Sequence, residues 1–349
     1  MRVIDRLDSY QREHRYAGLA LAVFYKLIED QATSLAAMIT YYGMVSLFPL
    51  LLLLTTCLGF ALSNDPVLQQ TVLHSALREF PVLGDQLGQN VHSLSGSNTG
   101  LAIGIAGSLY GGLGVALAIQ NAMNKIWCVP RAERPDVFRG YGRGLVLLAV
   151  LALDIGANAT LAGAVNALEE SSWGIVAVVW PVIAWLASLA LNVGLILLAY
   201  RILTVHSPAP RSLWPGALTA TLLWQILLGT GTYLVGHQLS RATATYGMFG
   251  IVLGLLTWIY LGALILILGA EINVVRLHRL HPRSLLAPDP HAGSLTPADE
   301  RSYIRYPQTE RHKAFHVVRS HFRSPSSGAA QRSPDATPPV PHPRAPEVR

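Results

Sequence analysis

The chain has 349 residues, of which 51% are apolar and only 13% are charged, and its formal net charge at pH 7 is +6. A soluble domain has about 25% charged residues, whereas residues 31–280 hold only 11 Lys/Arg and 9 Asp/Glu. These numbers exclude a single soluble domain. The two cysteines, Cys57 and Cys128, are far apart and exclude a disulfide scaffold or a thiolate metal site.

The N-terminal segment, residues 1–30, has the pattern of one amphipathic helix. Its apolar residues share a helical face with basic and acidic residues among them, and they are Leu19, Val23, Phe24, Leu27 and Ile28. This pattern is typical of a helix that lies in the cytoplasmic membrane interface. A cytosolic cap over the membrane domain is the alternative.

Residues 31–280 contain six apolar stretches, each long enough to cross a membrane. A helix rises 1.5 Å per residue, so about 20 residues cover about 30 Å of hydrocarbon. The predicted spans are Leu35–Leu62, Gly100–Gln120, Gly144–Ala167, Trp173–Tyr200, Leu213–Gly236 and Gly247–Ala270. The expected fold class is therefore all-α, a polytopic bundle of six transmembrane helices.

The basic residues in the connecting segments predict the orientation of this bundle. From the N-terminus to the C-terminus, the segments hold 5, 1, 5, 0, 2, 1 and 12 Lys/Arg. Cytoplasmic loops carry the excess of Lys and Arg, so both termini are expected in the cytoplasm. The long loop from Ser63 to Thr99 is then external, and its apolar spacing predicts short amphipathic helices at the outer mouth.

Residues 281–349 differ in composition, because they hold 12 of the 21 prolines together with many Ser, Arg and His. Such a segment buries too little apolar surface to offset its ordering entropy, so we expect a disordered cytoplasmic tail. Its 10 Lys/Arg against 6 Asp/Glu favour weak contact with anionic lipid head groups or nucleic acid. A solvated appendage without a partner is the alternative, and no specific nucleic-acid site is expected.

Polar residues inside the predicted spans are the candidate binding residues. Asp154, Asn158 and Asn166 lie on one stripe of the third span, and Asp154 is near its middle. A carboxylate at the bilayer centre costs about 2.5 to 3.5 kcal/mol, so Asp154 should face protein or water. One interpretation is a group that is protonated during transport. The other is a clamp of hydrogen bonds between helices.

Two further polar residues complete the candidate set. Gln225 marks one face of the fifth span, and Glu271 lies at the cytoplasmic end of the sixth. Burial of Glu271 is expected to be shallow, with Arg276, Arg143 or Arg201 as its ion-pair partner. A functional role for Glu271 stays open.

Small residues recur every four positions in the second span. The row consists of Gly100, Gly104, Ser108, Gly112 and Ala116. Small residues allow two helix backbones to approach closely, so the row predicts tight packing. The alternative is a gating hinge built from Gly107, Gly111, Gly112 and Gly114.

Several motifs, in a fixed order, resemble one known family. They are Ala36-Ala37-Met38-Ile39-Thr40-Tyr41-Tyr42, Ser46-Leu47-Phe48-Pro49, Asn121-Ala122-Met123-Asn124-Lys125-Ile126-Trp127, Tyr246-Gly247, Trp258-Ile259-Tyr260 and Gly269-Ala270-Glu271-Ile272-Asn273. Over about residues 15 to 280 the chain resembles the YihY / virulence factor BrkB family of bacterial inner-membrane proteins, whose members once carried the name ribonuclease BN. The resemblance implies six spans and an inner-membrane location, and it attaches no firm biochemical activity.

The sequence predicts membrane machinery rather than an enzyme. RNA hydrolysis needs a metal held by clustered His, Asp and Glu, or a paired acid and base, and neither pattern occurs in the sequence. We expect no catalytic residue, metal site or cofactor. A transporter-like protein that handles lipid or another amphipathic solute is the first hypothesis, a non-transporting envelope scaffold is the second and a ribonuclease is a remote third. Membrane lipids are the expected partners, with a second copy or envelope proteins left open.

Overall fold

The computed structural model describes residues 2–61, 98–169, 175–205, 208–234, 240–285, 295–313, 315, 317–320 and 322. Within these ranges the secondary structure consists of helices and turns, with no strand. The all-α prediction is therefore confirmed. The amphipathic helices predicted between Ser63 and Asn98 fall almost entirely outside the described residues.

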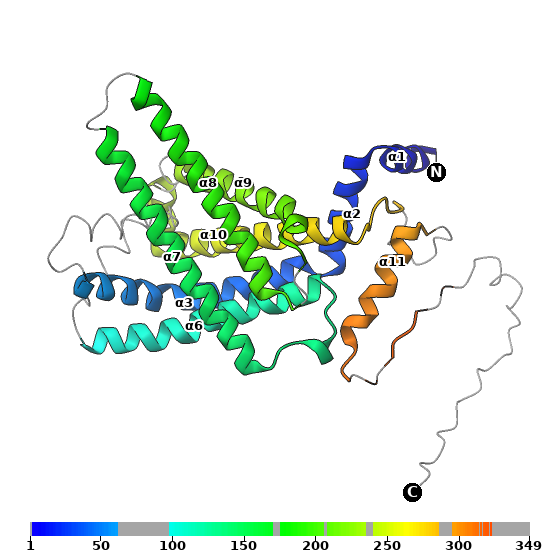
Figure 1. Ribbon diagram of the computed structural model, residues 1–349, viewed down its shortest axis with the longest axis horizontal. Helices are drawn as coiled ribbons and strands as arrows, with labels where there is room; N and C mark the ends of the chain where they lie inside the picture. The colour runs from blue at the N-terminus through cyan, green and yellow to red at the C-terminus, as the bar shows by residue number, and fades with distance from the viewer. Residues whose placement is uncertain are drawn as a thin grey trace, which may run out of the picture.

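Six long helices occupy the six predicted segments (Figure 1). They are α3 (Ala32–Ala61), α6 (Asn98–Ile126), α7 (Val137–Glu169), α8 (Ile175–Leu203), α9 (Pro210–Leu234) and α10 (Ser240–Leu277). Three described stretches are long and apolar enough to cross a membrane, namely Phe138–Asn158, Val182–Leu203 and Val252–Leu277. Only 6% of the most apolar window in Val182–Leu203 is buried inside the protein. The exposed apolar surface of these helices is what a membrane-spanning helix presents to lipid.

Helices α3 and α6 lie side by side, as Figure 1 shows, and glycine makes their contact close. Three glycines of α6 each lie where an added Cβ would collide with a residue of α3. The pairs are Gly107 with Pro49, Gly111 with Ser46 and Gly114 with Tyr42. Of the predicted row, Gly112 and Ala116 face α7 through Leu148 and Gly144. Helix α6 thus packs on two sides through two rows of small residues, and the glycines assigned to a hinge are packing residues.

Three shorter α-helices and two short 3₁₀ helices lie around one end of the bundle, at the right of Figure 1. They are α1 (Arg2–Glu13), α2 (Arg15–Glu29), η1 (Arg131–Glu133), α11 (Pro297–Arg305) and η3 (Tyr306–Glu310). Helix α2 packs against α10, and its outward side exposes Tyr16, Phe24 and Ile28. The predicted interfacial position of α2 stays a prediction.

Helix α11 corrects the expected tail, because Pro297–Glu310 is helical rather than disordered. Thr296 and Asp299 form a capping box at the start of α11, and Pro297 occupies its first turn. This combination fixes the first turn of a helix. Composition alone does not predict helix α11, since the prolines that predict disorder include the one that starts this helix.

Candidate functional site

Three buried charged side chains meet where α2 crosses the end of α10. The Lys26 Nζ donates a hydrogen bond to Oδ2 of Asp30 and lies 3.9 Å from Oε2 of Glu271. The exposed fractions of the three side chains are 3% for Lys26 and 0% for both carboxylates. Lys26 reaches this position because it shares the buried side of α2 with Ala22 and Val23.

In this cluster one ammonium group faces two carboxyl groups. Burial by itself would lower the pKa of Lys26, but the carboxylates of Glu271 and Asp30 outweigh burial and raise that pKa above its ordinary value. Burial raises the pKa of Asp30, while Lys26 opposes the change. The carboxyl groups of Glu271 and Asp30 also interact with each other. A buried carboxyl group is costly unless it is paired, so Lys26 is the residue that makes the burial of both groups tolerable.

The structure corrects two expectations for Glu271. Its burial is complete rather than shallow, and the cation beside it is Lys26 rather than an arginine. The physical reason is that α2 folds back over the end of α10 and covers a position that otherwise faces the membrane edge. The sequence carried one usable signal, the Lys26 and Asp30 pair at a spacing of four residues in an apolar helix.

The residues that flank Glu271 lock neighbouring helices in place. Asn273 accepts a hydrogen bond from the amide of Gly216 at 2.8 Å and donates one to the carbonyl of Leu213 at 2.9 Å, so its side chain ties α10 to the backbone of the first two turns of α9. The hydroxyl of Tyr200 donates to the carbonyl of Leu266 at 2.8 Å. Gly269 and Gly216 touch backbone to backbone, leaving no room for a Cβ at either position. The Gly-Ala-Glu-Ile-Asn motif therefore joins α8, α9 and α10.

A buried arginine holds α11 against α2. Arg283 forms an ion pair with Asp299 at 2.8 Å and with Glu29 at 2.7 Å, and its side chain is 1% exposed. The guanidinium also lies over the rings of Tyr25 and Tyr303. Cation–π contact and paired carboxylates together satisfy the buried charge. The end of the bundle is thus closed by residues that sequence reasoning had placed in a disordered tail.

The middle of α7 and the middle of α8 share a separate polar strip. Ser188 donates a hydrogen bond to Oδ1 of Asn158 at 2.8 Å, and the Asn192 amide donates to the Ser188 carbonyl at 2.8 Å. The Asn158 amide donates to the backbone carbonyl of Asp154 at 3.1 Å. Asp154 is half-buried, and its Oδ1 is enclosed without a hydrogen-bond partner among the described residues. Ser188 and Asn192 were not selected from the sequence, although they are polar residues four positions apart in an apolar helix, the same signal that selected Asp154 and Asn158.

The five predicted binding residues do not form one site. Asp154 and Asn158 lie together in the α7–α8 contact, whereas Glu271 belongs to the α2–α10 cluster. Gln225 is half-buried on α9, and the Asn166 side chain lies outside the described residues. In the described ranges, no group of three or more His, Cys, Asp or Glu could hold a metal ion. The charged side chains of the α2–α10 cluster and of the α7–α8 contact can bind ions or stabilise buried charge.

The apolar helices, the buried charges at one end and the polar strip at mid-helix define a polytopic, all-helical membrane protein. The family model "Virulence factor BrkB" matches residues 23–293, so the chain belongs to this family and the resemblance found in the sequence is confirmed. Its relatives support an inner-membrane location, as predicted, because they are named as membrane proteins.

Three relatives illustrate the similarity. The ribonuclease-like protein YfkH of Bacillus subtilis is 27% identical over 271 residues, which cover 75% of this chain and 94% of that protein. A UPF0761 membrane protein of Cronobacter sakazakii is 26% identical over 76% of this chain and 92% of its own length. The inner membrane protein YhjD of Escherichia coli is 24% identical over 64% of this chain and 70% of its own length. No solved structure matches.

Proposed function

We propose that this protein is a transporter-like inner-membrane protein that moves an amphipathic, lipid-like solute. The six long helices are its spans, and both termini are cytoplasmic. The observation that carries the proposal is Asp154, a half-buried carboxylate near the middle of the 33-residue α7. Its cost of about 2.5 to 3.5 kcal/mol on insertion scales needs a compensating role.

The hydrogen-bond clamp between α7 and α8 accounts for the neighbours of Asp154. Asn158, Ser188 and Asn192 satisfy one another across the helix contact. The Asp154 carboxylate interacts with the Asn158 side chain, but its Oδ1 has no donor in the described structure. A stabilising clamp therefore explains the amides and the hydroxyl and leaves one oxygen of the carboxylate unexplained. The Asp154 carboxylate is explained if it titrates during transport, or if it contacts a polar head group that passes along the strip.

The surroundings of the strip favour an amphipathic solute. Leu153 on α7 and Trp185 on α8 are largely exposed, so the strip lies beside surfaces that suit acyl chains. A polar strip next to apolar faces suits a molecule whose head group crosses while its tails remain in lipid. Membrane lipids are thus the proposed substrate class, and a second copy of the chain or envelope proteins stay open as partners.

A topology experiment tests the proposed spans. A reporter that is active only in the cytoplasm should work when fused after Arg349 or inserted between Arg131 and Arg139. It should fail when inserted beside Gln89, because that loop carries a single Lys/Arg and is expected outside. Cytoplasmic activity at Gln89 would overturn the six-span arrangement.

A transport experiment tests the role of Asp154. The full chain is reconstituted into liposomes that contain phosphatidylglycerol labelled on one acyl chain with a dithionite-sensitive fluorophore. Transfer between leaflets should exceed that of empty liposomes, and Asp154→Asn should fold normally and abolish the excess. Ser188→Ala is the matched control, because it weakens the clamp and keeps the carboxylate, so transfer should persist.

Two results would contradict the transport proposal. Wild-type protein that transfers no more lipid than empty liposomes would overturn lipid movement. Asp154→Asn protein that transfers lipid at the wild-type rate would remove Asp154 from the mechanism. The scaffold is the second candidate, and the specific observation in its favour is the tight glycine packing of α6 on α3 and of α9 on α10.

The ribonuclease-like name of YfkH is not carried over to this chain. Hydrolysis of RNA requires a bound metal or a positioned acid and base, and the described residues contain no His, Cys, Asp and Glu group able to hold a metal. Purified protein, freed of contaminating nucleases, should leave RNA intact with or without divalent metal. RNA cleavage abolished by a point substitution in this chain would reverse that expectation.

A further inference from the structure

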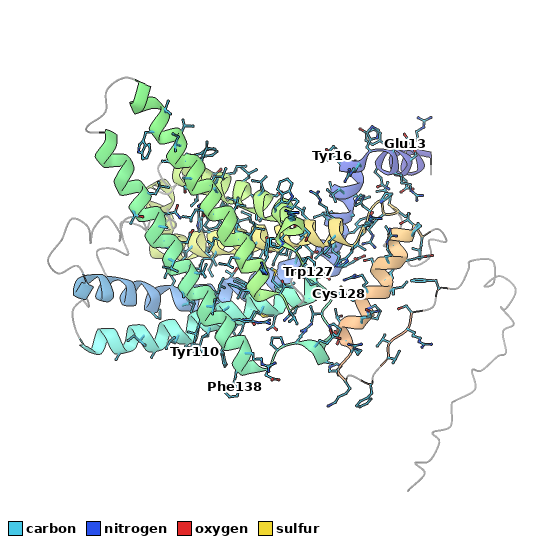
Figure 2. The ribbon with its side chains drawn as sticks, viewed as in Figure 1. Glu13, Tyr16, Tyr110, Trp127, Cys128 and Phe138 are labelled. Atoms are coloured by element: carbon cyan, nitrogen blue, oxygen red, sulfur yellow. The ribbon has the colours of Figure 1, made fainter. Side chains whose placement is uncertain are left out.

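A cleft of about 400 Å³ lies at the end of α10. Its walls come from four segments that are far apart in the sequence. They are the loop after α6 (Trp127), the segment just before α9 (Pro208), the end of α10 and the residue after it (Leu277 and His278) and the end of α11 (Arg305). Figure 2 shows Trp127 and Cys128 at this end of the bundle, between α10 and α11. The volume lies within the range of small-molecule sites.

Among its described lining residues the cleft has a positive charge, that of Arg305, and no carboxylate. Within the structure as described, Arg305 pairs with no acidic side chain. Its two terminal nitrogens instead lie 3.0 Å from the ring nitrogens of His278. Burial, together with the charges of Arg305 and Lys26, lowers the pKa of His278 to about 4. The ring is therefore neutral at pH 7 and does not offset the charge of Arg305, and each terminal nitrogen of the guanidinium has a second N–H that can donate to an anion.

Trp127 gives an independent indication of an absent acceptor. The side chain is 7% exposed, and its ring meets His278 edge to face with centroids 6.0 Å apart. Its indole N–H is buried and has no hydrogen-bond partner among the residues that the structure describes. A buried tryptophan N–H normally finds an acceptor, so the residue that forms this wall keeps one unfilled hydrogen bond among the described residues.

The position of the cleft defines the kind of anion. Leu277 is the last residue of the apolar stretch Val252–Leu277, so the cleft opens where hydrocarbon gives way to head groups. Tryptophan and arginine favour this layer, and basic pockets beside spans on the cytoplasmic side suit lipid head groups. Leu277 and Pro208 add apolar walls on which the glycerol region of a lipid can rest.

We propose that this cleft binds the phosphate group of an anionic glycerophospholipid. Arg305 donates hydrogen bonds to the phosphate oxygens, and Trp127 and His278 form the wall beside the phosphate. Arginine presents a planar fork of donors that matches two phosphate oxygens. The inference rests on the proposed function in one respect, the placement of α10 in the membrane. Inorganic phosphate has the same chemistry without the tails, and the experiment separates the two.

The test measures lipids retained by the full-length protein. Native mass spectrometry is performed from detergent micelles that contain equal amounts of phosphatidylglycerol and phosphatidylcholine. Wild-type protein should retain phosphatidylglycerol preferentially, and Arg305→Gln should lower that preference by about tenfold, as expected for loss of a charged hydrogen bond. Arg301→Gln is the matched control, because Arg301 lies on the same helix and bonds to the Arg279 carbonyl outside the cleft.

Three outcomes would overturn the site. Equal preference in wild-type and Arg305→Gln protein would exclude Arg305, and an equal loss in Arg301→Gln would show that net charge alone attracts the lipid. Excess inorganic phosphate should leave phosphatidylglycerol bound. If the phosphate displaces the lipid and binds only when Arg305 is present, the site takes free phosphate rather than a lipid. If protease sensitivity shows that Arg305→Gln undocks α11, Arg305→Lys replaces it and must still lower the preference, because lysine lacks the fork.

This result is separable from the transport proposal. Phosphatidylglycerol retention that depends on Arg305, in a protein that transfers no lipid between leaflets, would keep the cleft and remove transport. Normal transfer by Arg305→Gln protein with no lipid preference in the wild type would keep transport and remove the cleft.

Discussion

The end of the molecule formed by α2, the last turns of α10 and α11 buries charged side chains in pairs, whereas the α7–α8 pair exposes apolar side chains around one carboxylate. The paired groups are Lys26, Asp30, Glu271, Arg283, Asp299 and Glu29. Along the α8 stretch Val182–Leu203, by contrast, 6% of the most apolar window is buried. Burial of charge is tolerated when partners are supplied from within the protein. Exposure of apolar surface is tolerated when the surroundings are lipid.

The two regions therefore obtain their stability from different sources. The charged end is completed by its own residues, so substitutions there should act on folding. The α7–α8 pair is completed by the membrane, so substitutions of its polar groups should act weakly on folding. Under the proposed function, substitution of Asp154 should instead change transport. The following predictions, from the largest expected effect to the smallest, test that division.

The largest effect is expected from Lys26→Met. The substitution leaves Asp30 and Glu271 buried without their cation, which should cost about 3 to 5 kcal/mol. Chemical unfolding in detergent, followed by tryptophan fluorescence, would measure the change. Glu271→Gln is the control, because it leaves Lys26 and Asp30 as a balanced pair and should be neutral or stabilising. Equal damage by both substitutions would show that charge balance is not what Lys26 supplies.

The next effect concerns the backbone contact of α9 with α10. In Gly216→Ala the new Cβ would overlap the carbonyl of Gly269 and the side chain of Asn273, and overpacking of this kind costs about 1 to 3 kcal/mol. The thermal midpoint of the purified protein should fall. Gly229→Ala lies on the same helix with open space around it, so its midpoint should stay or rise. A neutral Gly216→Ala would mean that the contact is not tight.

A smaller effect is a pH dependence due to His278. Because the folded protein lowers the pKa of this ring from its ordinary 6.5 to about 4, the unfolded chain binds more protons between these values. Stability from His278 is therefore present above pH 6.5 and is lost as the pH falls toward 4. The residue is only partly enclosed, so the contribution is about 1 kcal/mol after allowance for solvent screening.

The control for this pH effect is His278→Gln, which keeps an acceptor for Arg305 and removes the titration. The difference in unfolding free energy between wild type and variant should shrink as the pH falls from 6.5 to 4. Subtraction of the variant also removes the titration of other groups, including Asp30 and His281, whose pKa values also shift. A pH-independent difference would contradict the buried, neutral imidazole.

The smallest effect is expected from Ser188→Ala in the α7–α8 clamp. Loss of its hydrogen bond to Asn158 should cost about 0.6 kcal/mol, the average for such bonds inside membranes. Thr160→Ala is the control, since the Thr160 hydroxyl bonds only within its own helix, to the carbonyl of Ala157. Destabilisation of several kcal/mol by Ser188→Ala would show that the α7–α8 contact is a main source of folding stability, which contradicts the comparison of this pair with the charged end.

The six long helices could be read from the sequence because hydrocarbon imposes a length and a composition on each span. Every predicted segment overlaps one of the long helices, and the observed helices extend beyond it at their described ends, as α10 does by seven residues on each side. Window composition fails at such ends because the last turns carry charge, for example Glu271 and Arg276 in α10. The number of spans and their orientation stay predictions, since only three described stretches meet the criteria for crossing a membrane.

The candidate sites were predictable in part. Asp154 and Asn158 could be selected because a polar residue in an apolar helix is conspicuous, whatever surrounds it. The role of Lys26 could not, because an amphipathic helix with basic residues looks the same whether its lysine faces water or a buried glutamate. Arg283 and Arg305 were assigned to a disordered tail for a similar reason, since composition averages over a nine-residue helix with its own capping box.

The sequence by itself determined the helical class, the family and the separation of an apolar domain from charged ends, because these follow from local composition and from motif order. Only the tertiary structure decided which charges meet. Lys26 and Glu271 are separated by 245 positions, and Trp127 and Arg305 by 178, so their proximity depends on how α2 and α11 fold over the bundle. Coulomb interactions and cavities are set by distances of a few ångströms in space, which spacing along the chain does not specify.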